Sequence, residues 1–203
     1  MSRSMYLAAI AALACAVGSA AASDGVTSTY TSTADKDCRK LSSFKIDGDD
    51  YASEYLCPGY AGLKVLKQED DLREKISVGR SAGAAAREPA AAQGFGPFNS
   101  TTNSVEWRVA NGRPFAMIQR WHIADNDDPD KTGRPQAKQM LVVTRLPPGA
   151  VCHVAYIDVT ANADANEIAR KAADEVARGF GCSTAKAGIA GVRGRTADFA
   201  ASR

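Results

Sequence analysis

The sequence lacks several features that would indicate a common function class. Its 25 Lys and Arg residues nearly balance 23 Asp and Glu, which leaves a formal net charge of +2 and excludes the basic excess typical of nucleic-acid-binding proteins. No apolar run after residue 22 is long enough to span a bilayer, and no internal repeat is apparent. We therefore expect no nucleic-acid partner and no transmembrane segment. The oligomeric state stays open.

The first 22 residues have the pattern of a secretory signal peptide. Arg3 is followed by an apolar run over 6–17 and by Ala20-Ala21-Ala22, a cleavage site of the A-x-A type. An alternative is a lipoprotein signal with Cys15 as the lipidated residue, although the preceding leucine is one position too close. The sequence thus predicts an exported protein, either periplasmic or secreted.

After the signal peptide, four cysteines remain, and none forms a C-x-x-C pair of the kind that binds zinc or does redox chemistry. In an exported chain, four cysteines indicate two disulfides. Three pairings are open. We favour Cys38 with Cys57 and Cys152 with Cys182, because each pair brackets one compact unit. No cofactor is predicted.

Alternating apolar residues predict strands, and a four-residue apolar spacing predicts one helix after them. The strands are expected at 63–67, 72–78, 104–110, 113–123, 139–146 and 151–159. The helix begins with a capping-box pattern, Asp164 with Glu167, and carries the stripe Ile168, Ala172, Val176 and Phe180. The predicted fold class is α+β: an antiparallel sheet of six or more strands with one C-terminal helix packed on it.

The domain boundaries follow from these elements. Residues 1–22 are the signal peptide, and 23–182 form a single α+β domain. Residues 183–203 are rich in small and basic residues and are expected to be a disordered tail.

The stretch from Ser104 to Ile123 contains both tryptophans of the chain. Asn111-Gly112 predicts a two-residue hairpin turn. With Val109 opposite Pro114 and an unbroken register, Trp107 and Trp121 would lie on opposite faces of the sheet. A one-residue bulge at Pro114 would bring them to the same face.

We expect an exported, disulfide-stabilised binding or interaction module of the bacterial cell envelope, which recognises a protein or an envelope component. No convincing catalytic constellation is present. The residue types of this hairpin are those that recur at interfaces. The candidate binding residues are Arg108, Arg113, Arg120, Trp121 and His122.

A small serine hydrolase is the second hypothesis. Ser81 lies in a G-x-S-x-G motif that follows a predicted strand, and His153 could serve as its base. Pro89 would stop the helix that such a motif normally begins, so a simple turn is the favoured interpretation.

Calcium binding is the third hypothesis. Asp128, Asp130 and Thr132 have the spacing of positions 1, 3 and 5 of an EF-hand loop. The twelfth position is Gln139, which lacks the bidentate carboxylate, so no metal site is assigned.

Several short motifs resemble a family of small uncharacterised secreted bacterial proteins. They include Cys57-Pro58-Gly59-Tyr60, Gly96-Pro97-Phe98-Asn99 and Cys152-His153-Val154-Ala155-Tyr156. The resemblance implies export but brings no activity and no functional residues. A weaker likeness is to periplasmic lysozyme inhibitors, in which a Tyr-x-Cys segment such as Tyr55-Leu56-Cys57 precedes a disulfide-bonded antiparallel sheet.

Overall fold

A computed structural model describes residues 25–46 and 49–201. The predicted signal peptide and Cys15 lie outside these residues. No helix in the described ranges is long and apolar enough to cross a membrane. The strands are β1 (Val26–Ser32), β2 (Arg39–Ile46), β3 (Asp49–Pro58), β4 (Lys64–Asp70), β5 (Arg73–Gly79), β6 (Asn99–Ala110), β7 (Arg113–Pro129), β8 (Pro135–Arg145), β9 (Cys152–Asp158) and β10 (Gly188–Ile189). The α-helices are α1 (Ala82–Ala86), α2 (Ala165–Val176) and α3 (Thr196–Ala201), with short 3₁₀ helices at Asp35–Asp37, Pro89–Ala92 and Ala177–Gly179.

The strands form one sheet in the order β10-β9-β8-β7-β6-β5-β4-β3-β2, and β1 also pairs with β6. Most pairs are antiparallel, but β10 runs parallel to β9, and β5 meets β6 in parallel at a single residue pair, Arg73 with Asn99. The predicted sheet and both disulfides, Cys38–Cys57 and Cys152–Cys182, are therefore confirmed. The prediction of a purely antiparallel sheet with a single helix is wrong, because β10 and β5 form parallel pairs and three α-helices are present in the described residues.

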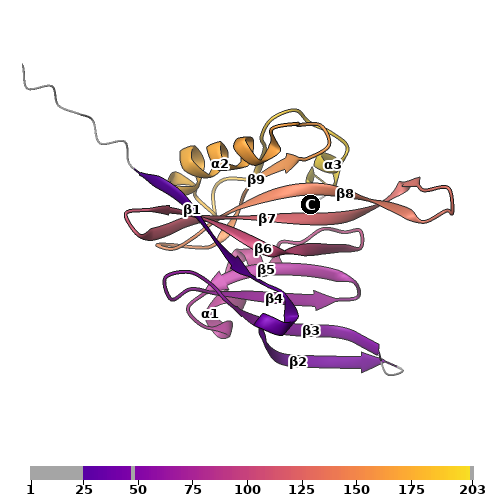
Figure 1. Ribbon diagram of the computed structural model, residues 1–203, viewed down its shortest axis with the longest axis horizontal. Coiled ribbons are helices and arrows are strands. Elements are labelled where there is room, and N and C mark those ends of the chain that lie inside the picture. The colour runs from indigo at the N-terminus through magenta and orange to yellow at the C-terminus, as the bar shows by residue number, and fades with distance from the viewer. Residues whose placement is uncertain (1–24, 47–48, 202–203) are drawn as a thin grey trace, which may run out of the picture.

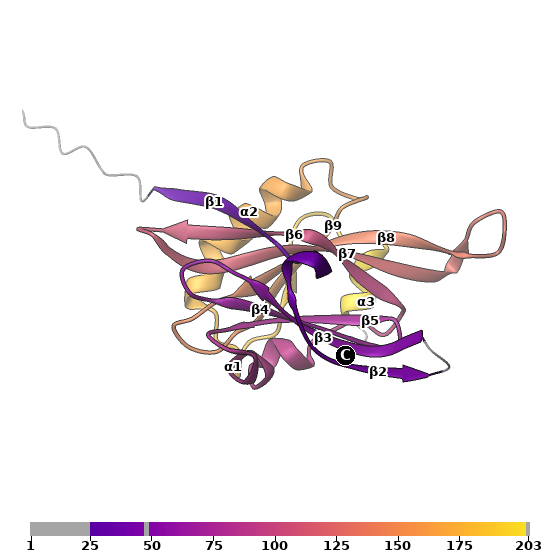
Figure 2. The same ribbon diagram turned by 60° about the horizontal axis from the view of Figure 1, so that its bottom comes forward.

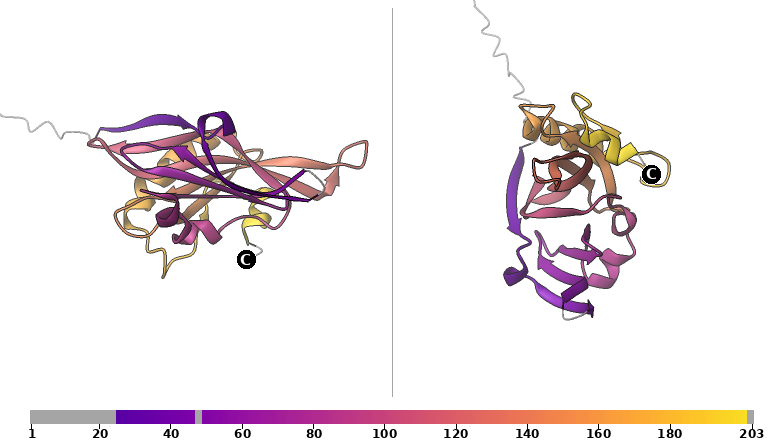
Figure 3. Two further views of the ribbon diagram at one scale, coloured as in Figure 1. Left: turned by 90° about the horizontal axis from the view of Figure 1, so that it is seen from below. Right: turned by 90° about the vertical axis from the view of Figure 1, so that its right-hand side faces the viewer.

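The sheet bends where β5 and β6 separate, and its two halves enclose the main core. That core joins Val65 and Ile76 from one half to Trp107, Met117 and Trp121 from the other. A second core lies on the opposite face of β6 to β9, under α2. Figure 3 (right) shows the resulting order of α2, the later strands and the earlier strands, and Figure 2 shows α1 on the far side from α2.

A one-residue bulge decides which side chains enter each core. Val109 pairs with Pro114 as expected, but Arg108 pairs with Ala116 and Trp107 with Met117, so Phe115 is the extra residue. The bulge shifts the alternation of β7 by one position. The unbroken register that would separate Trp107 from Trp121 is therefore wrong. Both are at most 1% exposed and belong to the same core.

The helix α2 packs mainly through alanines, and the predicted stripe is confirmed only in part. Ala165, Ala169, Ala172 and Ala173 are buried, Ile168 and Phe180 are partly buried against the same core, and Val176 is 42% exposed. Small side chains let a helix approach a sheet closely, which explains why the larger residues lie beside the contact. Asp164 is the residue before the first turn, but its side chain makes no capping hydrogen bond.

The segment after Cys182 is not a disordered tail over its described residues 183–201. It forms β10 and α3, and its backbone is held by two buried side chains, one at the end of β9 and one in the loop that follows. Asp158 accepts hydrogen bonds from the backbone N–H groups of Thr160, Ala161 and Thr196, and Asn162 bonds both backbone groups of Val192. Composition alone predicted disorder because it does not reveal these distant partners.

We expect the close packing of Gly194 against Asp158 to control whether the C-terminal segment stays docked on the end of β9. A methyl group on Gly194 would overlap the carboxylate of Asp158, whereas one on Gly188 would meet nothing within 4 Å. We expect Gly194→Ala to release the C-terminal segment and to speed tryptic cleavage after Arg193 and Arg195 at least tenfold, since proteolysis follows local opening. Gly188→Ala is the matched control, and equal cleavage rates in the two variants would contradict the docking.

Acid should weaken the same contact. Burial raises the pKa of Asp158, but the hydrogen bonds from Thr196, Ala161 and Thr160 outweigh it and hold the pKa below the usual 3.8. The stabilisation is therefore complete above pH 3.8 and is lost as the pH falls through the lower folded-state value. We expect Asp158→Asn to lose about 2 kcal/mol of unfolding free energy at pH 7 and progressively less in acid. Denaturant titrations at several pH values test this, and parallel curves would refute it.

Candidate functional site

The structure separates the five residues that the sequence analysis grouped on the hairpin. Arg108 is buried, and its guanidinium group makes two hydrogen bonds to the Asp174 carboxylate on α2, at 2.9 and 2.6 Å. Beside it, Arg170 of α2 bonds Glu106 at 2.7 Å. Burial raises the pKa of Glu106, but hydrogen bonds from Arg170 and Ser28 outweigh this effect and lower it overall. These pairs fasten α2 to β6, so Arg108 faces the protein rather than a ligand.

Arg120 and Trp121 also have partners within the fold. Arg120 donates to the amide oxygens of Gln139 and Asn166, at 2.9 and 3.1 Å. Trp121 is 1% exposed and packs edge-on against Phe95, with ring centroids 5.0 Å apart. Of the predicted binding residues, His122 and Arg113 each line a hollow in the described surface, and the two hollows are different.

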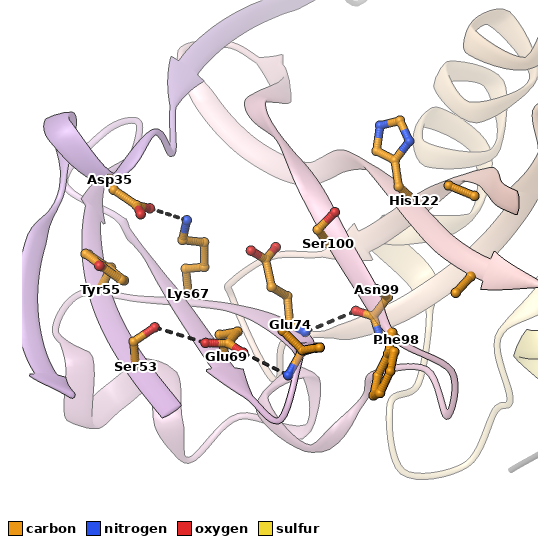
Figure 4. A pocket seen from close by; sticks show the side chains of 13 residues that line it. Asp35, Ser53, Tyr55, Lys67, Glu69, Glu74, Phe98, Asn99, Ser100 and His122 are labelled. Carbon is orange, nitrogen blue, oxygen red and sulfur yellow. Dashed lines mark hydrogen bonds and ion pairs between the residues drawn. The ribbon is translucent and has the colours of Figure 1, made fainter. Parts of the chain in front are cut away.

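His122 lines a polar groove of about 510 Å³ that opens where the two halves of the sheet separate. Figure 4 shows this groove, with Lys67 and Glu74 pointing to the same side of the sheet. Other lining residues are Asp35, Tyr55, Glu69, Asn99 and Ser100.

The charges of the polar groove are already partnered. Lys67 pairs with Asp35 at 2.5 Å and lies 5.2 Å from the centre of the Tyr55 ring. Glu74 accepts hydrogen bonds from the backbone and hydroxyl of Thr101. These charged side chains have partners within the protein, which argues against the groove as a binding site for a charged ligand.

Arg113 lines the second hollow, which we call the arginine pocket. Its volume is about 680 Å³, within the range of small-molecule sites. Four of its twelve lining residues are arginines and the other eight are apolar. The arginines are Arg80, Arg113, Arg145 and Arg178. The apolar walls include Leu63, Ala110, Pro114, Phe115, Leu146 and Pro148.

The topology explains why four distant arginines meet. Arg80 follows the end of β5, Arg113 begins β7, Arg145 ends β8, and Arg178 follows the end of α2. All of these positions lie at one end of the molecule, on the left in Figure 1. The chain leaves this end and returns to it three times, in steps of 33, 32 and 33 residues.

Within the described residues, none of the four pocket arginines forms an ion pair, and no carboxylate lines the pocket. The ion pairs there are formed by other arginines and by lysines. Arg145 donates to the backbone carbonyls of Ala150 and Pro148, at 2.6 and 2.7 Å, and its Nε is a buried donor without a protein acceptor. The Arg178 guanidinium lies over the Phe115 ring, 4.1 Å from its centre. The pocket is thus positioned to bind an anion.

The alternative catalytic residues lie in different surroundings. Ser81 is exposed at the start of α1, and its hydroxyl accepts a hydrogen bond from the backbone N–H of Ala84. His153 is 2% exposed, and its Nδ1 lies 3.1 Å from the hydroxyl of Tyr156. A base buried in this way cannot reach a substrate at the surface without a rearrangement.

The alternative calcium residues are on the long β7–β8 hairpin that projects from the body in Figure 1. Asp130 accepts hydrogen bonds from the backbone and hydroxyl of Thr132 within the turn, and Asp128 pairs with Lys138. Within the described residues, no group of three or more His, Cys, Asp or Glu is arranged to hold a metal ion.

No protein-family model, curated protein or solved structure matches this chain. The resemblances to a secreted bacterial family and to lysozyme inhibitors therefore stay predictions. The candidate site is defined by the geometry of the chain itself.

Because the Ser81 hydroxyl caps α1, we expect Ser81→Ala to cost about 1 kcal/mol of stability. We also expect a fluorophosphonate probe to leave the wild-type protein unlabelled, as measured by intact mass. Stoichiometric labelling that is lost in Ser81→Ala would instead establish a nucleophilic serine.

Proposed function

We propose that this protein is an exported, disulfide-stabilised binding module of the bacterial cell envelope, and that the arginine pocket is its ligand site. The observation that carries the proposal is the convergence of four arginines on an apolar-walled hollow that no carboxylate lines. Guanidinium groups bind carboxylate and phosphate oxygens in paired, directional hydrogen bonds. The ligand we propose is a component of the envelope or of a partner molecule that presents such an anionic group.

The proposed export and compartment rest on the sequence and the disulfides rather than on the arginine pocket. The signal-peptide pattern of residues 1–22 and the two disulfides favour an oxidising compartment, periplasmic or extracellular. The hydrolase and calcium hypotheses have less support, because His153 is buried and Asp130 is engaged in its own turn.

Ala61 offers a matched test of the arginine pocket. It is exposed, lines the pocket and has a φ of 51°, a conformation that both Asp and Asn tolerate. Ala61→Asp would place a carboxylate among the arginines, and Ala61→Asn has nearly the same shape without the charge. We expect inorganic phosphate at ten times its Kd to stabilise the wild type and Ala61→Asn by about 1.4 kcal/mol, and Ala61→Asp by much less.

The measurement is the melting temperature with phosphate against sodium chloride at matched ionic strength. The Asn variant separates pocket binding from the general stabilisation that phosphate gives to folded proteins. Equal phosphate responses in the Asp and Asn variants would exclude the arginine pocket as the site.

A further inference from the structure

The arginine pocket has a restricted chemistry, because its side chains offer hydrogen-bond donors and apolar surface only. An arginine donates through five N–H bonds and accepts none. Among the lining residues there is no Ser, Thr, Asn, Gln, Tyr or His. A ligand with many hydroxyl donors, such as a sugar, would find no side-chain acceptors here, and its unpaired hydroxyls would make binding costly.

The only aromatic side chain of the pocket is also occupied. The Arg178 guanidinium covers the Phe115 ring, so that face is not free to stack on a nucleobase or a sugar ring. The remaining walls are aliphatic, from Leu63, Pro114, Leu146 and Pro148. Such walls lower the free energy of an aliphatic ligand by removing it from water.

The cations have two different arrangements. Arg145 and Arg178 are fixed by the backbone of the β8–β9 turn and by Phe115, respectively. Arg80 and Arg113 are exposed, and no hydrogen bond or ion pair is recorded for either side chain within the described ranges. The fixed pair gives a preorganised anion site, and the exposed pair can close on the ligand after it enters.

From these features we infer that the arginine pocket binds a single-chain amphiphile, with its phosphate or carboxylate head on the arginines and its aliphatic chain along the apolar walls. This inference rests on the proposed function and specifies its ligand. Within the described surface, the large apolar side chains that are exposed do not line the pocket; they are Tyr30, Phe44, Tyr51, Leu72, Phe98, Val176 and Val192. The pocket therefore has no protruding apolar rim for insertion into a bilayer, which favours a free amphiphile over a membrane surface.

The test is isothermal titration calorimetry of the full exported chain, with intact disulfides, against dodecyl phosphate below its micellar concentration. Inorganic phosphate and dodecyl maltoside are the comparison ligands, because one lacks the chain and the other lacks the charge. We expect dodecyl phosphate to bind at least tenfold more tightly than either.

Two pairs of exposed arginines give matched variants. Arg80→Gln with Arg113→Gln should weaken dodecyl phosphate binding at least tenfold. Arg87→Gln with Arg134→Gln makes the same change in net charge at exposed positions away from the pocket and should change the affinity less than twofold. Ala110→Phe would narrow the space between the apolar walls, so it should weaken the binding of dodecyl phosphate and leave the binding of inorganic phosphate unchanged. Ala110→Leu is the milder variant if the first fails to fold.

The outcomes distinguish this inference from the proposed function. Suppose inorganic phosphate and dodecyl phosphate bind with equal affinity and Ala61→Asp abolishes both. The pocket would then be an anion site, and the inference that it binds an amphiphile would be refuted. Equal binding of dodecyl maltoside would overturn it too, as unspecific apolar binding. Co-sedimentation with phosphatidylglycerol vesicles without binding of monomeric dodecyl phosphate would identify a membrane surface instead. No binding of any anion would refute the proposed function itself.

Discussion

The extra residue in β7, Phe115, is the constraint on which the rest of the structure depends. By shifting the alternation of β7 by one position, the bulge turns Met117 and Trp121 toward the core that Trp107 occupies. It also leaves Phe115 at the end of the sheet, where the ring supports Arg178. One inserted residue thus sets the composition of the main core and supplies the aromatic wall of the arginine pocket.

The protein contains two kinds of arginine. Arg108 and Arg170 lie between β6 and α2, where Asp174 and Glu106 neutralise them with hydrogen bonds of 2.6 to 2.9 Å. A guanidinium in a buried position needs such a partner, because desolvation without compensation is costly. The arginines of the pocket have no carboxylate among the residues that line it, yet Arg145 is partly buried there. This contrast, rather than the number of arginines, is the reason for proposing the pocket as a ligand site.

Local patterns predicted much of the fold. The Asn111-Gly112 turn, the strands near β4, β5, β8 and β9, the helix after them and both disulfide pairings follow from spacing and residue type. The predictions that failed share one cause. In each, the residue that determines the local structure is distant in the sequence. Asp158 holds Thr196 across 38 residues, Arg108 meets Asp174 across 66, and the bulge depends on how β7 packs between two cores. Neither composition nor periodicity contains these contacts.

The arginine pocket illustrates the same limit. Arg113 was selected for its neighbours in the hairpin, whereas its neighbours in the arginine pocket include Arg80 and Arg145, which are 33 and 32 residues away, and Arg178, which is farther still. The four arginines meet because each stands where the chain is at this end of the molecule, at the end of β5, the start of β7, the end of β8 or just after α2. Spacing alone is not enough, since Arg87 and Arg120 are also 33 residues apart and do not line the pocket. The ends of these elements therefore determine which arginines meet, and the bulge at Phe115 determines what they rest on.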